Sequence, residues 1–198
     1  VLLGASNAAR CIATAVAVAR SLCGGPFDLL AALGHGRSYG RGSCVLGRWL
    51  PGILECRLWR DLRDRAPEPS HAVLTDVGND ILFGASPAQI SGWVRECIER
   101  LQSAECRLVV TGIPLASLAR MSRWEFPIFR TVFFPGCRLT FSDAINRATE
   151  LDGELRQIAN EAQVTYVEPL AEWYTRDRIH ISRARQAEAW RAFMAPLR

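Results

Sequence analysis

The sequence predicts an α/β fold in which a parallel sheet carries helices on both faces. Short apolar runs alternate along the chain with longer segments of helical pattern, as repeated βαβ units require. The apolar runs are nearly continuous, which is typical of strands that are buried on both faces. With 198 residues, the chain is long enough to build one domain around a substantial core. We therefore expect a single domain over residues 1–198.

The expected elements follow one another as strand and helix. The predicted strands are residues 1–3, 27–33, 72–76, 107–112 and 164–167. The predicted helices are residues 8–23, residues 48–63, a helix after Ser86, a helix from Thr140 to about Ala162, and a last helix from Ser182 to about Pro196. The helix after Ser86 has the clearest start, because Pro87 and Gln89 complete the pattern of a capping box. Together these elements predict a three-layer, flavodoxin-like, doubly wound sheet of about five parallel strands.

Composition narrows the classes of protein that the chain can belong to. The net charge is +4, but the basic residues are interleaved with acids, so they indicate a solvated surface and not a nucleic-acid site. No apolar run is long enough to span a membrane. The proline-containing stretch 67–70 is expected to be a surface loop within the domain.

The seven cysteines are odd in number and include no C-x-x-C pair. A complete disulfide framework is therefore excluded, and a zinc site is disfavoured. A reducing compartment is the simpler interpretation of this usage. The chain starts directly in an apolar run with no signal-peptide pattern, and we expect a cytoplasmic location.

Polar residues gather at one predicted edge of the sheet. Doubly wound sheets bind ligands beyond the carboxyl ends of their strands, next to the first strand. Ser6, the glycine-rich loop 34–40, Asn79 and residues 113–114 each follow a predicted strand and share that edge. The sequence therefore places a candidate site there.

Ser6 lies in the turn between the first strand and the first helix. A helix N-terminus presents free N–H groups and a partial positive charge, which favour a developing alkoxide or oxyanion. The alternative is that Ser6 or Asn7 only caps the helix. The turn has neither the G-x-G-x-x-G pattern nor a P-loop, and it does not match the serine elbow of α/β-hydrolases.

Asp177 and His180 are three residues apart, just before the last helix. At this spacing the carboxylate can bond one imidazole nitrogen and leave the other free to face Ser6 as a general base. The alternative is an ordinary polar loop. Only two other histidines are present, His35 and His71, and neither has an acid at a comparable spacing.

Two further segments offer hydrogen-bond donors for an oxyanion. The side-chain amide of Asn79 follows a buried strand, although Gly78-Asn79-Asp80 is also a common turn sequence. We expect Asp80 to hold the loop and not to react. Gly36 is the first choice for a second, backbone donor, and Gly40 is the next choice.

In these residues the chain resembles the SGNH (GDSL-type) hydrolases. That family has a serine after the first strand, a glycine after the second, G-x-N-D after the third and D-x-x-H before the last helix. Ser6, Gly36, Asn79, Asp177 and His180 match these blocks in order. The chain departs from the family at Ala5, where an acid is usual, and at Val77, where a glycine is usual.

The resemblance implies a serine esterase without metal or cofactor, which acts on a small-molecule ester. It also implies that Ser6 is the nucleophile, that His180 is the base and that Asp177 orients the base. The oxyanion hole would be formed by the N–H groups of Ser6 and Gly36 and the amide of Asn79. Two alternatives stay open: an acyltransferase that uses the same acyl-enzyme, and a degenerate domain that binds without turnover.

The stretch 115–141 is rich in aromatic residues. It is interpreted either as an acyl pocket or lid beside the site, or as a helix and loop that only cover the sheet. The sequence does not distinguish a short acyl ester from a lysophospholipid, an acetylated sugar or a thioester.

Overall fold

The computed structural model describes residues 1–65, 68 and 70–197. Two residues of the expected surface loop at 67–70, residues 67 and 69, therefore lie outside the described residues, and Ser70 already belongs to a strand. The sheet has five parallel strands in the order β2-β1-β5-β6-β7. Their bounds are Leu2–Leu3 (β1), Ala31–Ala32 (β2), Ser70–Leu74 (β5), Cys106–Thr111 (β6) and Thr165–Val167 (β7).

The strand order confirms the predicted flavodoxin-like topology. From β1 the chain moves outward to β2, crosses back to β5 on the other side of β1, and continues to β6 and β7. The connections therefore reverse direction between β1 and β5, which is the switch point where such sheets bind ligands. The segments that follow β1 and β5 carry Ser6 and Asn79.

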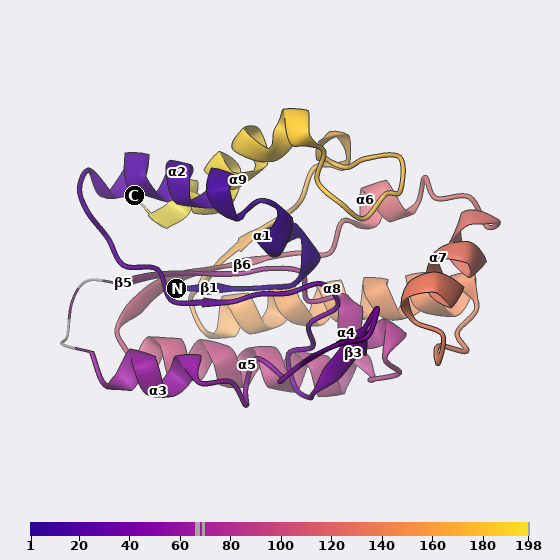
Figure 1. Cartoon of the computed structure of the whole chain (residues 1–198), viewed down its shortest axis with the longest axis horizontal. Helices are drawn as coiled ribbons and strands as arrows, with labels where there is room; N and C mark the ends of the chain where they lie inside the picture. The colour runs from indigo at the N-terminus through magenta and orange to yellow at the C-terminus, as the bar shows by residue number, and fades with distance from the viewer. Residues whose placement is uncertain (66–67, 69, 198) are drawn as a thin grey trace.

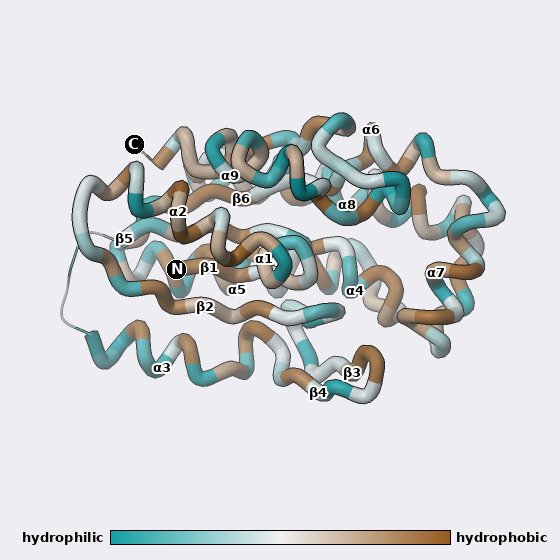
Figure 2. The backbone as a smooth tube through the Cα atoms, turned by 45° about the horizontal axis from the view of Figure 1, so that its top comes forward, coloured by the Kyte–Doolittle hydropathy of each residue, from teal (hydrophilic) through white to brown (hydrophobic). Residues whose placement is uncertain are grey.

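Helices cover both faces of the sheet, so the molecule has the three predicted layers (Figure 1). One face carries α1 (Ser6–Arg10), α2 (Ile12–Cys23) and α9 (Gln186–Met194), and the other carries α3 (Leu58–Arg63), α5 (Pro87–Ser103) and α8 (Phe141–Glu161). Successive strand residues alternate between the two cores: Leu2 and Val73 pack on the first face, and Leu3 and Leu74 on the second. The tube is accordingly hydrophobic at β1, whereas β5 begins with the hydrophilic residues Ser70 and His71 (Figure 2).

The two longest helices begin where the sequence predicts. In α5, Ser86 Oγ accepts the N–H of Gln89 at 3.2 Å, and the Gln89 side chain accepts the N–H of Ser86 in return. In α8 the same box is formed by Thr140 and Asp143. These reciprocal bonds satisfy helix N–H groups that would otherwise lack partners.

Several predicted bounds are wrong. The helix predicted over 8–23 is divided at Cys11 into α1 and α2, and α1 begins two residues earlier, at Ser6. Only Ala31–Ala32 of the strand predicted over 27–33 pairs with β1. Ser182 precedes a short 3₁₀ helix, η2 (Arg183–Arg185), and its side chain makes no capping bond.

The helix predicted over 48–63 is wrong in its first half. A hairpin of β3 (Ser43–Val45) and β4 (Arg48–Leu50) occupies that region, and only α3 is helical. The hairpin turns at Leu46 and Gly47, which both have positive φ, as a tight two-residue turn requires.

The short helices α4 (Asn79–Leu82) and η1 (Ala171–Trp173) lie where no helix was predicted. The helices α6 (Leu115–Leu118) and α7 (Glu125–Phe133) lie in the stretch 115–141, for which a helix and loop was one interpretation, and η3 (Ala195–Leu197) overlaps the end of the predicted last helix. Among the residues that the structure describes, no helix is both long and apolar enough to cross a membrane.

Candidate active site

Ser6 is the first residue of α1 and follows β1 after a short turn. The N-cap position belongs to Ala5, and no side chain makes a capping bond there, so neither Ser6 nor Asn7 is a helix cap. The Ser6 N–H lies in the first turn, where no intrahelical acceptor exists. Gly4 allows the turn to be this tight, because a Cβ at that position would lie 2.8 Å from both Ala8 Cβ and Thr75 Cγ2.

The carboxylate of Asp76 supports this turn from the end of β5. One of its oxygens accepts the N–H groups of Ala5 and Ala8, both at 3.0 Å. The other accepts the side-chain amide of Asn7 at 2.9 Å. Residue 5 is alanine and has no carboxylate. The carboxylate that contacts the Ser6 turn therefore comes from Asp76, just beyond the neighbouring strand β5.

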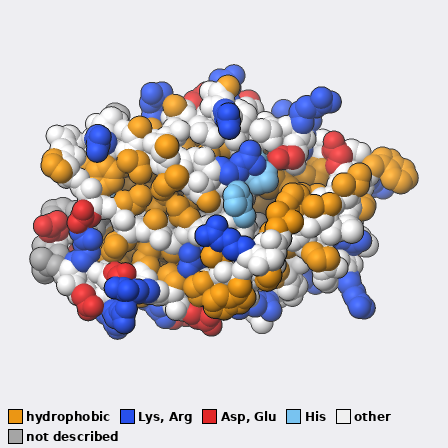
Figure 3. Space-filling model, viewed as in Figure 1, with side chains coloured by type: hydrophobic (Ala, Val, Ile, Leu, Met, Phe, Trp, Pro, Cys, Tyr) orange, Lys and Arg blue, Asp and Glu red, His pale blue; other side chains and the backbone are white. Residues whose placement is uncertain are grey.

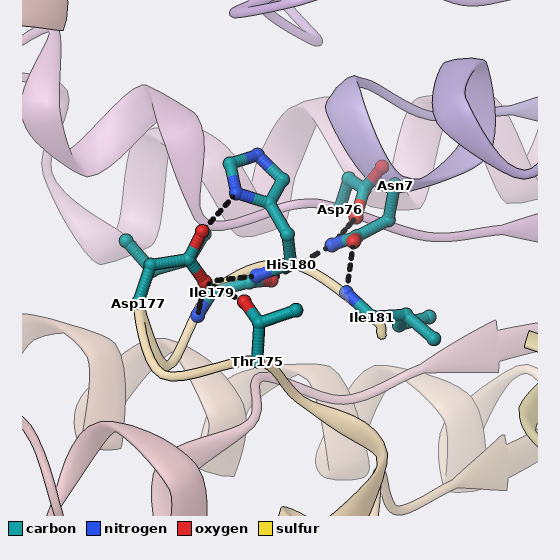
Figure 4. Close-up of polar contacts among 7 residues, drawn as sticks. All are labelled: Asn7, Asp76, Thr175, Asp177, Ile179, His180 and Ile181. Atoms are coloured by element: carbon teal, nitrogen blue, oxygen red, sulfur yellow. Dashed lines mark hydrogen bonds and ion pairs between the residues drawn. The ribbon is translucent and has the colours of Figure 1, made fainter. Parts of the chain in front are cut away.

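Asn7 connects the Ser6 turn to the loop that carries His180 (Figure 4). Its amide nitrogen also donates to the carbonyl of Ile179 at 3.0 Å, and its amide oxygen accepts the N–H of Ile181 at 2.8 Å. Both residues that flank His180 are thus bonded to the residue that follows Ser6.

The side chains of Asp177 and His180 are paired as predicted. One carboxylate oxygen of Asp177 lies 2.8 Å from His180 Nδ1. The other accepts the N–H groups of His180 at 2.9 Å and Ile179 at 3.0 Å and the hydroxyl of Thr175 at 2.5 Å. Burial alone would raise the pKa of Asp177, but these hydrogen bonds outweigh it and hold that pKa well below its usual range. An ionised carboxylate on Nδ1 keeps the proton on that nitrogen and leaves Nε2 as the acceptor.

Asn79 is the first residue of α4, and it shares a pocket with Ser6. Its side-chain nitrogen is buried and has no acceptor among the described residues. A buried amide without a partner is costly, and native proteins rarely retain one without a reason.

Asp80 holds the glycine-rich loop, as expected. It is fully buried and accepts the N–H of Tyr39 at 2.9 Å and the hydroxyl of Ser38. Burial raises the pKa of Asp80 to about 6, and the bonds from Ser38 and Tyr39 lower it only in part. The loop that carries Gly36 is thereby fixed to the helix that begins at Asn79.

Gly36 and Gly40 differ as candidate donors. The N–H of Gly40 is occupied, because it donates to Ser38 Oγ at 3.2 Å. The N–H of Gly36 has no acceptor among the described residues. Gly36 also requires glycine, because its φ is +66° and a Cβ there would lie 2.2 Å from Val45 Cγ2. Neither glycine lines the pocket that contains Ser6 and Asn79.

This pocket has a volume of about 120 Å³ and is mainly apolar. Besides Ser6 and Asn79, its walls include residues of α6, α7 and α8, among them Leu118, Phe126, Phe129, Phe141, Ala144 and Ile145. The aromatic stretch 115–141 therefore forms part of a pocket and does more than cover the sheet. A larger cavity of about 820 Å³ lies at the opposite end of the strands and includes none of the predicted site residues.

Sequence reasoning missed the Asn7–Asp76 connection. The strand predicted over 72–76 includes Asp76, whereas Asp76 lies just beyond β5 with a φ of +60°. The available signal was a polar residue directly after an apolar strand at the switch-point edge. In the described part of the chain, no group of three or more His, Cys, Asp or Glu side chains could hold a metal ion.

Comparison with solved structures defines the class of fold. The chain superposes on a GDSL-like lipase of Bacteroides thetaiotaomicron with a TM-score of 0.62 and 13% identity, over 99% of this chain and 85% of that one. For TesA, the TM-score is 0.62 and the identity 16%, over 100% and 98% of the two chains. For the psychrotrophic esterase EstA of Pseudoalteromonas, the values are 0.61 and 12%, over 99% and 96%.

The fold is thus the one found in this GDSL-like lipase, in TesA and in the esterase EstA, along the whole chain. No protein-family model matches the sequence, and no curated protein matches it. The likeness to known proteins therefore lies in the fold.

Proposed function

We propose that the protein is a serine hydrolase of the SGNH type that cleaves a carboxylic ester through an acyl-enzyme on Ser6. The observation that carries this proposal is the unpartnered, buried amide of Asn79 in the pocket that also contains Ser6. A ligand that supplies an acceptor would stabilise such a donor. The tetrahedral intermediate of acyl transfer supplies a charged one.

In the proposed mechanism, Ser6 Oγ attacks the ester carbonyl while His180 Nε2 takes the hydroxyl proton. Asp177 keeps the other nitrogen protonated and stabilises the imidazolium that forms. The oxyanion accepts hydrogen bonds from the Ser6 N–H and the Asn79 amide, which share the pocket. The Gly36 N–H, which has no acceptor of its own among the described residues although Gly36 does not line the pocket, is the proposed third donor. The C–O bond to the alcohol then breaks, and His180 gives its proton to the departing oxygen.

The second half of the reaction repeats these steps with water. His180 takes a proton from the water as its oxygen attacks the acyl carbonyl, and the acid leaves as the bond to Ser6 Oγ breaks. His180 returns that proton to Ser6, which restores the free enzyme. No metal or redox cofactor takes part in the proposed steps.

The pocket indicates the acyl part of the substrate. An apolar cavity of about 150 Å³ holds a benzene molecule, and the pocket beside Ser6 measures about 120 Å³. We infer that it accepts an unbranched acyl group of roughly six carbons or fewer. Burial of each methylene contributes about 0.8 kcal/mol, so affinity should rise with chain length until the pocket is full.

The test compares hydrolysis of p-nitrophenyl esters by the protein and by two histidine variants. His180→Ala should reduce kcat roughly 10⁴-fold or more, because the serine loses its base. His71→Ala is the matched control, since His71 lies in β5 beside the larger cavity at the opposite end of the strands. Near-normal activity of a folded His180→Ala variant would overturn the assignment.

A further inference from the structure

Helix α7 carries apolar side chains on two sides. On its inner side, Phe126 and Phe129 line the pocket beside Ser6. On its outer side, Trp124, Ile128 and Val132 recur every fourth residue and are 84%, 68% and 53% exposed. We call these three residues the outer stripe. A helix at a protein surface normally exposes a polar face, whereas α7 exposes the three apolar side chains of the outer stripe to solvent.

The chain segment that carries the outer stripe is rich in arginine. Between Leu115 and Phe141 the chain has four arginines and a single acid, Glu125. Arg120, Arg123 and Arg138 are exposed. Figure 1 shows α7 at one end of the molecule, beyond the end of the sheet. In the same view, hydrophobic side chains reach the surface at that end, and both basic and acidic side chains lie near them (Figure 3). The tube is strongly hydrophobic along part of α7 (Figure 2).

We propose that the outer stripe and its arginines dock the protein on an anionic lipid surface. Tryptophan and aliphatic side chains on one side of a short helix, with arginines at the rim, are suited to the boundary between headgroups and acyl chains. The excess of arginine complements anionic headgroups. A stable protein interface requires about 20 to 30 residues on each side, far more than the three apolar side chains of the outer stripe.

The position of α7 connects this docking to the pocket. The outer stripe and the pocket wall lie on opposite sides of one helix, which is about 10 Å across. A docked protein would therefore hold its acyl pocket close to the lipid, and its ester substrate would be an amphiphile drawn from that surface. This last step rests on the proposed function, whereas the docking itself does not.

The experiment measures binding to vesicles by sedimentation, without any turnover. The protein is mixed with vesicles of phosphatidylcholine alone, or of equal parts phosphatidylcholine and phosphatidylglycerol, at low and high salt. We expect binding to the anionic vesicles, weak binding to the neutral ones, and loss of binding as salt rises. Because no catalysis is measured, failure of the esterase proposal would leave the result intact.

Two pairs of variants locate the contact. Trp124→Ala with Ile128→Ala should weaken vesicle binding by roughly tenfold or more, because both apolar anchors are lost. Trp49→Ala is its control, since Trp49 is 65% exposed on the β3–β4 hairpin. Each basic residue near an anionic surface strengthens binding about fivefold, so Arg120→Glu with Arg123→Glu should cost more than roughly 20-fold. Arg20→Glu with Arg60→Glu, on exposed positions of α2 and α3, is the control for charge.

Three results would overturn the proposal. The first is no sedimentation with anionic vesicles at low salt. The second is undiminished vesicle binding by the Trp124→Ala, Ile128→Ala variant and by the Arg120→Glu, Arg123→Glu variant. The third is a dimer in solution that the Trp124→Ala variant dissociates, because the outer stripe would then be covered by a second copy of the chain. Circular dichroism of each variant checks folding, and exposed positions should leave the spectrum unchanged.

Discussion

The side-chain amide of Asn7 donates to the carboxylate of Asp76 at 2.9 Å, and this bond joins two elements at the switch point of the sheet. Asp76 also binds two N–H groups of the Ser6 turn, and Asn7 binds both neighbours of His180. The proposed nucleophile and base are thus held by one connected set of hydrogen bonds. A network of this kind fixes geometry only when every member is satisfied.

Replacing Asp76 by Asn should destabilise the fold by about 1–3 kcal/mol. The amide has one oxygen and one NH₂ group, so it cannot accept on both sides as the carboxylate does. Urea unfolding measures the loss, with Asp64→Asn on the exposed end of α3 as control. Equal unfolding midpoints for the two variants would show that the Asp76 network does not stabilise the fold.

Asn79→Ala should lower kcat by roughly 10²- to 10³-fold and change KM little, because the amide binds an oxyanion that exists only during reaction. Steady-state kinetics on a p-nitrophenyl ester measures both constants. Asn146→Ala, on the exposed side of α8, removes an amide away from the site. If kcat is unchanged in Asn79→Ala, the side chain belongs to the turn alone.

Pocket residues on α8 should set the preferred chain length. Ile145→Ala enlarges the pocket and should shift the highest kcat/KM to longer acyl esters, whereas Ala144→Leu fills it and should shift the preference to shorter ones. A series of p-nitrophenyl esters from acetate to decanoate measures the shift. Identical chain-length profiles in both variants would mean that the acyl group binds elsewhere.

The buried carboxyl of Asp80 should make stability depend on pH. Its pKa is raised from 3.8 to about 6, so the folded state keeps a proton that the unfolded state has lost in this interval. The contribution of Asp80 to stability is therefore greatest below pH 3.8 and falls as pH rises to about 6, by on the order of 3 kcal/mol. Above about pH 6, Asp80 is ionised in both states, and its contribution to stability no longer changes with pH.

Urea unfolding of the protein and of Asp80→Asn, repeated between pH 4 and 7, isolates this dependence. The difference in free energy of unfolding between the two proteins should change by on the order of 3 kcal/mol as pH rises through the pKa of Asp80. A difference that is independent of pH would show that Asp80 has an ordinary pKa in the folded state.

Local signals predicted much of the fold. Ser86 and Thr140 begin the two longest helices because each forms a capping box, which a few neighbouring residues fully determine. The region 48–63 was mispredicted because its outcome depends on a turn at Leu46 and Gly47 and on pairing with Ser43–Val45. Tertiary pairing of that kind is not visible in helical periodicity.

The candidate site also contains residues that local sequence patterns predict and residues that only long-range contacts reveal. Ser6, Asn79, Asp177 and His180 could be selected because each is a polar residue at a predicted strand end or before a helix. The hydrogen bond from Asn7 to Ile179 joins residues that are 172 positions apart in the sequence, and no local sequence pattern predicts it. The bonds that Asn7 and Asp76 make could therefore be identified only in the folded structure.

The most direct test of the account is covalent labelling of Ser6. The protein and a Ser6→Ala variant are treated with a fluorophosphonate probe, and the modified peptide is identified by mass spectrometry. We predict one label on Ser6, no label in the variant, and slower labelling in His180→Ala because the hydroxyl loses its base. A protein that takes up no label while it hydrolyses esters, or a label that persists in Ser6→Ala, would contradict the assignment of Ser6 as nucleophile.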